Sequence, residues 1–364
     1  MALGSALAGG TDGGVRARPL TLALGDVASR AELLLPASTA PAPLVLLIQG
    51  TGPEDRDGSF TAPGGAVQGS LGQLAQTLAR EGFAVMRYDK RYAAQALSPA
   101  TAQAAQTQYA ALRMTDLLSD ARTALNAARQ QPGVDGRQVF IYGWSEGSVV
   151  AASLAQEIGA QGLIVQGPVV DGFAAAFANQ FSTVGLNYLR PYAREGQMDL
   201  AGVLQALRGP GSPLAKMQAT LLLDRTSTAE RPKLATILDT DGDGRLDLKR
   251  EVEPRLLGFY EALTATSPLY APATTLPTLG AWVPVLRVPV LILQGENDGN
   301  INVQDARRLD AMLRAAGRVP STLKVYPGLG HSLGAAPDMT RDNFAPMAQQ
   351  PMNDLVAWLR ARRH

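Results

Sequence analysis

Residues 139–148 carry the strongest chemical signal in the chain. A β-branched and aromatic run beginning at Val139 leads into Gly143-Trp-Ser145-Glu-Gly147 and then into a small-residue, helix-like stretch. A sharp strand-to-helix turn of this kind lifts a serine Oγ out of a sheet, and glycines flank it because side chains there would collide with the crowded turn. Ser145 is therefore the candidate nucleophile.

A serine nucleophile needs a base and an acid. Asp298 follows the apolar run 288–294, so we expect it at the carboxyl end of a strand, where open α/β sheets place their ligand sites. His331 lies in a glycine-rich loop after the next predicted strand, and the only other histidine is the terminal His364. We expect Ser145, Asp298 and His331 to converge as nucleophile, acid and base.

Composition narrows the partners of the chain. Its 364 residues include 33 basic and 32 acidic side chains, so a broad electrostatic footprint for nucleic acid or anionic lipid is not expected. The absence of cysteine excludes disulfides, thiolate catalysis, zinc–thiolate sites and iron–sulfur clusters. No apolar run approaches the roughly 18 residues that span a bilayer. The expected partner is a small molecule.

The elements that position these residues alternate as in an α/β fold. Strands are predicted within 20–48 and at 83–88, 139–144, 163–166, 288–294 and 322–326, with helices at 70–82, 114–125, 303–316 and 352–359. The alternation stops near residue 168 and resumes near 288, which indicates an insertion. We predict a flexible segment at 1–18, a first core part at 19–167, an inserted, mainly helical cap at 168–283 and a second core part at 284–364.

The loop 49–58 carries a family resemblance. It reads Gln49-Gly50-Thr51-Gly52-Pro53-Glu54-Asp55-Arg56-Asp57-Gly58 and resembles the His-Gly-Ser-Gly-Pro-x-Asp-Arg-Asp-Gly loop of bacterial serine carboxylesterases in the α/β-hydrolase superfamily. The segment 87–91, the acid loop 295–301 and the base loop 326–331 also resemble that family. Gln49 stands where the family often has histidine, and Tyr92 departs from its Arg-Gly continuation.

The resemblance implies an α/β-hydrolase fold, with a mostly parallel sheet flanked by helices and an inserted cap. The chain order Ser, Asp, His is the order expected of that superfamily. It further implies that the backbone N–H groups of Thr51 and Glu146 form an oxyanion hole. The expected function is a serine carboxylic-ester hydrolase that acts on small or medium acyl esters through an acyl-enzyme, with no cofactor required for catalysis.

Other functions fit the same residues. An acyl thioesterase or a peptidase-like acyl hydrolase would use the same triad, and fold does not choose between them. A hydrolase scaffold that binds a ligand without turnover belongs to a different class. Around the site, we expect loop-bracing ion pairs rather than substrate ligands from Asp55, Arg56, Asp57, Asp89 and Arg91. Trp144 is expected either to line the acyl pocket or to pack under the cap.

A second motif lies within the predicted cap. Residues 239–247 place carboxylates at loop positions 1, 3, 5 and 9 and a glycine at position 6, as in a calcium loop. The candidate ligands are Asp239, Asp241, Asp243, the carbonyl of Arg245, and Asp247. Position 12 is Arg250 instead of glutamate, so a solvated acidic turn is the alternative to a structural calcium ion.

This motif also bears on where and how the chain acts. A calcium-dependent interaction module would be a third class of function. The calcium-like loop and the Gly/Ala-rich beginning favour an exported protein, with a cytoplasmic one as the alternative.

Overall fold

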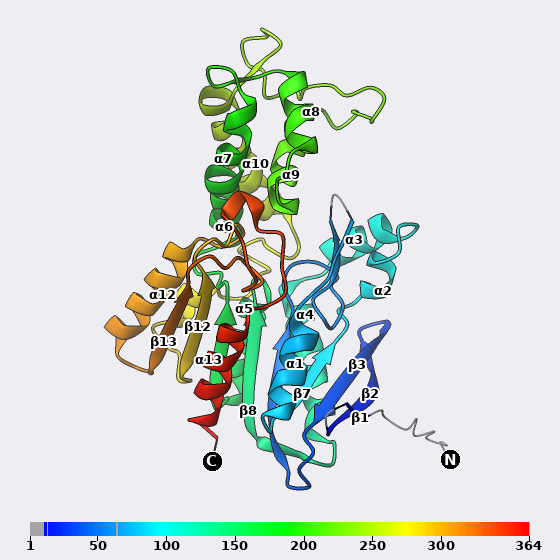
Figure 1. Cartoon of the computed structure of the whole chain (residues 1–364), viewed down its shortest axis with the longest axis vertical. Helices are drawn as coiled ribbons and strands as arrows, with labels where there is room; N and C mark the ends of the chain where they lie inside the picture. The colour runs from blue at the N-terminus through cyan, green and yellow to red at the C-terminus, as the bar shows by residue number, and fades with distance from the viewer. Residues whose placement is uncertain (1–10, 13, 63–64, 364) are drawn as a thin grey trace.

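The framework of the molecule is a single large sheet. A computed structural model describes residues 11–12, 14–62 and 65–363, and within them nine strands pair in one sheet (Figure 1). In sheet order these are β1 (Thr11–Asp12), β2 (Val15–Leu24), β3 (Val27–Leu35), β7 (Ala84–Tyr88), β4 (Ala42–Ile48), β8 (Val134–Trp144), β9 (Gly162–Gln166), β12 (Val290–Gly295) and β13 (Ser321–Tyr326). The strands from β7 to β13 run parallel, and β1 to β3 form an antiparallel edge. The predicted mostly parallel sheet is confirmed.

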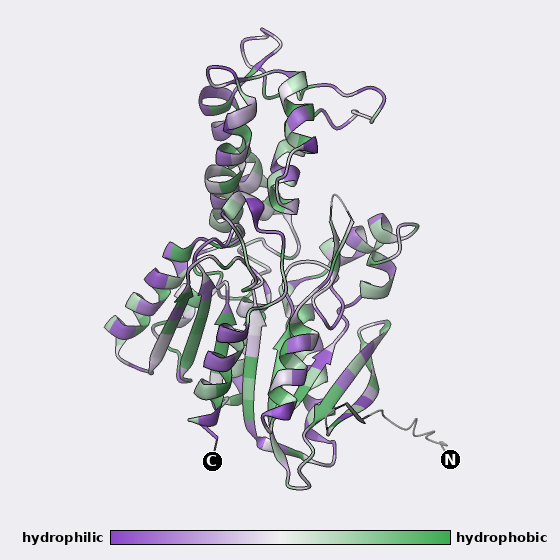
Figure 2. Cartoon of the chain, in the orientation of Figure 1, coloured by the Kyte–Doolittle hydropathy of each residue, from purple (hydrophilic) through white to green (hydrophobic). Residues whose placement is uncertain are grey.

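Helices cover both faces of this sheet. One face carries α1 (Leu71–Arg80) and α13 (Gln349–Arg360), and the other carries α4 (Met114–Arg129), α5 (Gly147–Ile158), α11 (Leu279–Trp282) and α12 (Val303–Ala316). Along β8, Phe140 and Tyr142 enter one core and Val139 and Ile141 enter the other. Burial on both faces explains the continuous apolar runs of these strands, which stand out in Figure 2.

The segment Phe173–Thr266, which we call the cap helices, rises above the carboxyl ends of the parallel strands (Figure 1). It comprises α6 (Phe173–Asn179), η1 (Gln180–Gly185), α7 (Leu186–Leu189), η2 (Arg190–Tyr192), α8 (Leu200–Arg208), α9 (Pro213–Thr220), η3 (Leu248–Val252) and α10 (Glu253–Thr266), with β10 (Gln197–Met198) paired to β11 (Leu246–Asp247). These elements have their own apolar core. The returning side chains of Leu269, Leu276 and Val283 instead join a core of the sheet.

Short elements complete the chain. They are the hairpin β5 (Phe60–Ala62) and β6 (Gly65–Val67), helices α2 (Ala93–Ala96) and α3 (Ala102–Ala110), and η4 (Met339–Arg341). The hairpin follows the 49–58 loop and reaches the cavity described below. Helix α3 contributes the buried Tyr109.

Two details differ from the sequence-based expectations. A flexible segment was predicted at 1–18, yet Arg16 to Arg18 pair with Leu33 to Leu35 as part of the antiparallel edge, because strand pairing satisfies their backbone groups. Residues 1–10 and 13 lie outside the described part. The helix predicted at 70–82 spans Leu71–Arg80, and Ser70, a residue type that often caps a helix, makes no side-chain cap bond because its Oγ accepts a hydrogen bond from the Met347 N–H at 3.1 Å.

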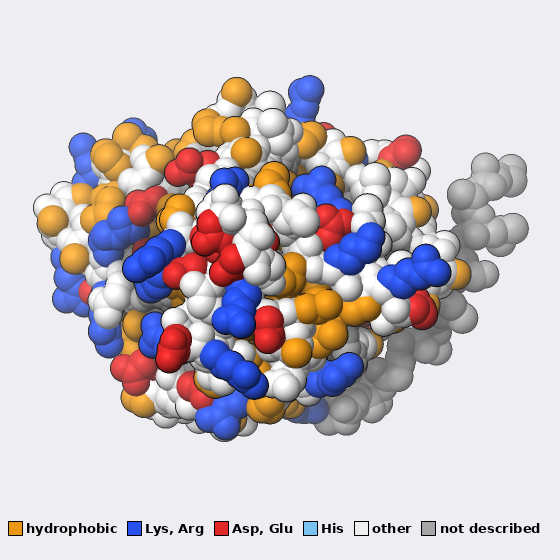
Figure 3. Space-filling view, turned by 90° about the horizontal axis from the view of Figure 1, so that it is seen from above, with side chains coloured by type: hydrophobic (Ala, Val, Ile, Leu, Met, Phe, Trp, Pro, Cys, Tyr) orange, Lys and Arg blue, Asp and Glu red, His pale blue; other side chains and the backbone are white. Residues whose placement is uncertain are grey.

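The surface agrees with the balanced composition. Seen from the cap end, Lys and Arg side chains are interspersed with Asp and Glu side chains (Figure 3). In the described residues, none of the helices has the length and apolar character needed to cross a bilayer.

Candidate active site

Ser145 occupies a strained turn between β8 and α5. Its φ is +55°, a left-handed conformation that non-glycine residues rarely adopt. The flanking glycines are required by close backbone approach: a Cβ at Gly143 would lie 2.5 Å from Ala151 Cβ, and one at Gly147 would lie 2.7 Å from the carbonyl oxygen of Ile48. The sequence therefore forms the predicted elbow at Ser145.

Asp298 follows β12 at the carboxyl end of the sheet. Its Oδ1 accepts hydrogen bonds from the backbone N–H groups of Asn300 and Ile301, both at 2.8 Å. Its Oδ2 accepts one from Gln294 Nε2 at 3.0 Å and lies 2.8 Å from His331 Nδ1. These bonds engage both carboxyl oxygens and fix the orientation of the group, with Oδ2 facing the imidazole.

His331 is buried and gripped through its backbone. Its carbonyl oxygen accepts hydrogen bonds from Trp144 Nε1 at 3.1 Å and Gln166 Nε2 at 2.7 Å, and its N–H donates to Asp342 at 2.7 Å. Burial opposes a charge on the imidazole, but the Asp298 carboxylate, its hydrogen bond and Asp342 outweigh that effect and raise the pKa of His331. The ring therefore has the surroundings of an oriented base.

Ser145 and His331 line one cavity, together with Thr51 and Glu146. Within the described residues, no hydrogen bond joins Ser145 Oγ to His331. Such bonds are often long in free enzymes and tighten when substrate is bound. The structure thus brings the predicted nucleophile, base and both oxyanion residues to one space, with Asp298 behind the base.

The cavity extends from Ser145 into the cap helices. Its volume is about 500 Å³, within the range of about 300–1,000 Å³ that is common for small-molecule sites. Its apolar lining from outside the elbow comprises Phe60, Ala62, Val169, Phe173, Ala176, Phe177, Pro213, Leu214, Met217, Leu221, Phe259, Tyr260, Leu263, Tyr270, Ile301 and Phe344. A lining of this kind suits a lipophilic ligand.

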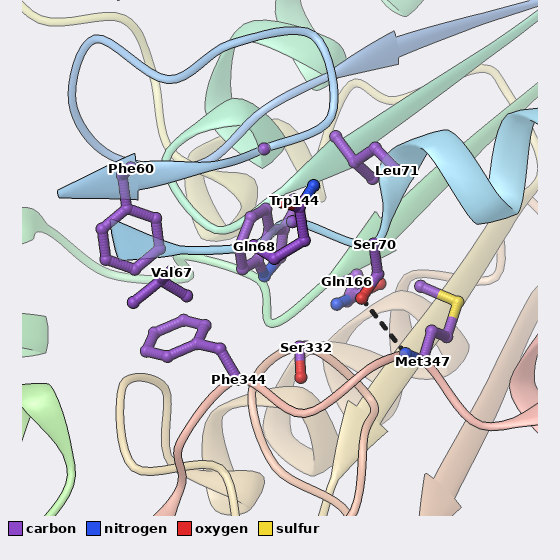
Figure 4. Close-up of a pocket in the computed structure, with 12 residues that line it drawn as sticks. Phe60, Val67, Gln68, Ser70, Leu71, Trp144, Gln166, Ser332, Phe344 and Met347 are labelled. Atoms are coloured by element: carbon purple, nitrogen blue, oxygen red, sulfur yellow. Dashed lines mark hydrogen bonds between the residues drawn. The ribbon is translucent and has the colours of Figure 1, made fainter. Parts of the chain in front are cut away.

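Of the two positions that the sequence left open for Trp144, the structure shows the first, in the wall of a pocket. It lines the large cavity, and it also lines a small adjoining pocket of about 10 Å³ (Figure 4). Phe60 and Phe344 close that pocket, with ring centroids 5.1 Å apart and edge to face. Trp144 therefore supports the His331 loop while it walls the cavity.

The family-type loop is braced by ion pairs and hydrogen bonds. Asp89 binds Arg30 at 2.9 Å and also accepts a hydrogen bond from the Arg56 N–H. Asp57 pairs with Arg87, and Asp55 accepts from two N–H groups of its own loop. The predicted bracing role is thus observed, although the partner of Arg91 is Asp120 of α4 rather than the loop.

The two departures from the family pattern have local explanations. Gln49 is fully buried, and its Nε2 donates to the carbonyl oxygens of Asp55 and Tyr88, so it supports the loop and does not line the cavity. Tyr92 has a φ of +66°. That conformation favours glycine, which is consistent with the glycine expected near this position.

Several residues contact the site although the sequence did not suggest them as site residues. Asp342 accepts from the N–H groups of Gly299 and His331 and so joins the acid and base loops. Burial and the charge of Asp298 raise the pKa of Asp342 to about 6. Lys90 and Tyr270, far apart in sequence, both bind the Glu146 carboxylate. Lys90 belongs to the family-like segment 87–91, but only the tertiary contacts show which groups these three residues bind.

The acidic loop of the cap has the shape of a tight turn. Carboxylate oxygens of Asp239, Asp241 and Asp243 lie within 4.8 Å of one another. Asp247 instead caps the following helical turn, accepting from the N–H groups at 249 and 250. Glu251 ties the loop together by accepting from Thr240 and from the Asp247 N–H.

Comparison with known proteins identifies the fold. Residues 65–224 match the family model described as Serine aminopeptidase, S33, a span that includes Ser145 but neither Thr51, Asp298 nor His331. No curated protein matches the sequence significantly. A thermostable carboxyl esterase from Bacillus coagulans superposes with a TM-score of 0.51 at 16% identity, covering 96% of this chain and 98% of that one.

Two further solved structures are similar. An acylaminoacyl peptidase from Pyrococcus horikoshii has a TM-score of 0.51 at 12% identity, over 96% of this chain and 42% of that one. A dienelactone hydrolase-like promiscuous phosphotriesterase from metagenomic libraries has a TM-score of 0.50 at 13% identity, over 96% and 99%. The fold is that of the α/β-hydrolases. The predicted enzyme class of the chain, a serine hydrolase, is confirmed at this general level by the match to the family model.

Proposed function

We propose that this α/β-hydrolase is a serine carboxylic-ester hydrolase in which Ser145, His331 and Asp298 form the triad. The observation that carries the proposal is the strained Ser145, which shares a cavity with a buried histidine whose Nδ1 lies 2.8 Å from Asp298. The resemblance of the 49–58 loop to carboxylesterases favours an ester over other acyl compounds.

The reaction follows from these positions. His331 takes the Ser145 proton as Oγ attacks the ester carbonyl carbon, and Asp298 holds the imidazole tautomer and stabilises its cation. The carbonyl oxygen becomes an oxyanion, which the N–H groups of Thr51 and Glu146 bind. Collapse breaks the bond to the alcohol oxygen, which leaves with the proton of His331. Water, activated by the same base, then cleaves the acyl-enzyme and releases the carboxylic acid.

The cap is proposed to select the substrate. We assign it the inserted segment 168–283, between core parts 19–167 and 284–364, because its helices supply much of the cavity lining. An acyl thioesterase or peptidase-like hydrolase with the same triad is the alternative. Relative turnover of an ester, the matching thioester and the matching anilide distinguishes these three substrates.

The direct test compares turnover of p-nitrophenyl esters from acetate to palmitate. Ser145→Ala and His331→Ala should each lower kcat by at least about 10³-fold, because triad members act as a unit. Ser153→Ala is the matched control, since this buried serine of α5 donates only to the Val149 carbonyl. A folded wild type that is inert to every ester and to a serine-directed fluorophosphonate would leave the ligand-binding scaffold as the better description.

A structural calcium ion in the cap remains a prediction. Asp239, Asp241, Asp243, the Arg245 carbonyl and Asp247 would supply hard oxygen ligands of the type that calcium prefers. Arg250 at position 12 offers none. If calcium binds, adding 2 equivalents or more should raise the midpoint of thermal unfolding, and Asp241→Asn should remove that shift while ester turnover at low temperature stays unchanged. Identical melting in calcium and in chelator would exclude the ion.

A further inference from the structure

A buried lysine links the two segments that supply the proposed oxyanion donors. Lys90 follows β7, and 4% of its side chain is exposed. Its Nζ donates to the Gly50 carbonyl oxygen, to Tyr109 Oη at 2.9 Å and to Glu146 Oε1 at 3.0 Å. All three ammonium protons are therefore directed at fixed partners.

The bond to the Gly50 carbonyl fixes the direction of the Thr51 N–H. The two groups belong to one peptide unit, which is planar and trans, so the carbonyl and the N–H point in opposite directions. Because Lys90 holds the carbonyl on one side, the Thr51 N–H is directed away from Lys90. A cation on the carbonyl also polarises the peptide and makes its N–H a stronger donor.

The second donor segment is held through a side chain. The Glu146 carboxylate is buried and accepts hydrogen bonds from Lys90, from Tyr109 at 2.6 Å and from Tyr270 at 2.7 Å. These bonds fix the residue whose backbone N–H is the other proposed donor. Tyr270 lies beyond the cap helices, so the chain returning from the cap also bears on this position.

We propose that Lys90 is a positioning residue for the oxyanion hole, setting the mutual orientation of the Thr51 and Glu146 N–H groups without contacting substrate. The inference rests on the proposed ester hydrolysis. Loss of Lys90 should therefore weaken stabilisation of the transition state more than it weakens substrate binding, because the oxyanion exists only after the nucleophile has attacked.

The test removes Lys90 without leaving the buried Glu146 carboxylate unpaired. In Lys90→Met combined with Glu146→Gln, both buried charges disappear together. We expect kcat to fall about 10- to 100-fold, the size of effect that a small misplacement of catalytic groups causes, while KM stays within about threefold. Affinity for a boronic acid, whose serine adduct carries a tetrahedral oxyanion, should fall by the same factor as kcat.

The matched control is Arg91→Met combined with Asp120→Asn. This variant removes a neighbouring buried ion pair, with bonds of 2.7 and 2.8 Å, that touches neither Gly50 nor Glu146. Its kcat should stay within about threefold of wild type. Lys90→Arg keeps the charge but not the three-bond geometry, so it should show the same kcat-specific loss and carries the test if the double variant does not fold.

Two results would overturn the inference: a kcat-neutral, folded Lys90 variant, or an equal loss in the Arg91 control. The proposed function is judged separately, by whether wild-type turnover depends on Ser145.

A second observation concerns Glu54, a different side chain of the 49–58 loop. Glu54 lines the cavity but is only 3% exposed, and among the described residues its Oε2 has no hydrogen-bond partner. It flanks the nucleophile: a Cβ at Gly50 would lie 3.4 Å from Glu54 Oε1 and 3.5 Å from Ser145 Cβ. A buried polar atom without a hydrogen-bond partner destabilises the protein, so a ligand group that forms this hydrogen bond should bind more tightly.

The charge of the surroundings decides what Glu54 can bind. The ammonium of Lys90 bonds to the Glu146 carboxylate, whereas Lys90 contacts Glu54 through its backbone N–H, which donates to the Glu54 carbonyl oxygen at 3.0 Å. Burial, only partly offset by Lys90, raises the pKa of Glu54 well above its usual range. A neutral carboxylic acid offers an O–H donor.

We infer that Glu54 donates a hydrogen bond to an ether or carbonyl oxygen of an uncharged, otherwise lipophilic substrate. This inference also rests on the proposed function. It names the substrate class as esters that carry a second acceptor oxygen near the scissile bond.

An oxygen scan of the acyl chain tests this assignment. In p-nitrophenyl hexanoate, one methylene at a time is replaced by oxygen, and each kcat/KM is divided by that of hexanoate. At one position of the chain, this ratio should be about 3- to 10-fold lower in Glu54→Met than in wild type, which is the value of one neutral hydrogen bond. Glu54→Gln keeps a donor and should retain the wild-type ratio.

Equal ratios in both variants at every position would refute the assignment. If wild type instead prefers an acyl chain that bears an ammonium group, and Glu54→Gln abolishes that preference, then Glu54 acts as a carboxylate and the assignment is wrong.

Discussion

At the scale of residues, the site depends on hydrogen bonds that keep each group in one state. Asp298 accepts hydrogen bonds from two backbone N–H groups and a glutamine amide besides its contact with His331, so both of its carboxyl oxygens have protein partners. With its Nδ1–H directed at Asp298, the imidazole keeps Nε2 as the acceptor for a serine proton. The catalytic state is thus prepared before substrate arrives.

The pH profile of Asp298→Asn tests this arrangement. Since the pKa of His331 is raised, wild-type kcat/KM should rise with pH along a limb above pH about 6.5, the ordinary histidine value. Loss of the carboxylate should move that limb to lower pH and lower kcat about 10⁴-fold. Initial rates between pH 4 and 9 measure both effects. An unmoved limb would mean that another group controls it.

At the scale of elements, the turn that carries Ser145 forms where the backbone of α5 packs so closely against the end of β4 that a side chain does not fit between them. The first turn of α5 lies against the end of β4 at Gly147. Gly147→Ala should lower the free energy of unfolding by about 1–3 kcal/mol or more, as overpacking does, and should reduce turnover because the elbow shifts. Gly172→Ala, where an added Cβ meets nothing within 4 Å, should change stability by less than about 0.5 kcal/mol. Urea unfolding measures both variants.

The link between the acid and base loops predicts a pH-dependent stability. The pKa of Asp342 in the folded protein is raised to about 6. Its protonated form therefore contributes to the free energy of unfolding below pH about 4, and this contribution is lost as pH rises through about 6. The stability of wild type relative to Asp342→Asn should therefore decrease between pH 4 and 7, by on the order of 1–3 kcal/mol. Unfolding free energies measured at each pH decide this, and a constant difference would contradict it.

At the scale of the whole molecule, the cap helices and the loops at the carboxyl edge of the sheet together line the cavity. Met217 of α9 lines it and is 41% exposed, so it stands at an accessible part of the wall. Met217→Trp should lower kcat/KM for dodecanoate about tenfold relative to acetate, since added bulk there meets only a long chain. Ile237→Trp is the control, because Ile237 is 75% exposed and does not line the cavity. A uniform change across chain lengths would exclude a role for α9 in selecting the acyl group.

The sequence by itself determined the local parts of this protein. Gly143-x-Ser145-x-Gly147 predicted an elbow, and apolar runs predicted strands buried on both faces, because these features depend on backbone sterics and on side-chain periodicity over a few residues. The chain order of Ser145, Asp298 and His331 placed three loops at one edge of the sheet. Such signals are short-range and can be recognised without coordinates.

Only the tertiary structure decided which distant residues complete the site. Lys90, Tyr109 and Tyr270 meet at Glu146, and Asp342 joins the loops of Asp298 and His331. No periodicity announces these contacts, because a buried polar group needs a partner but its sequence does not say which one. The shape of the cavity is also decided only by the tertiary structure, because it depends on how the cap helices, which have their own apolar core, are positioned above the sheet.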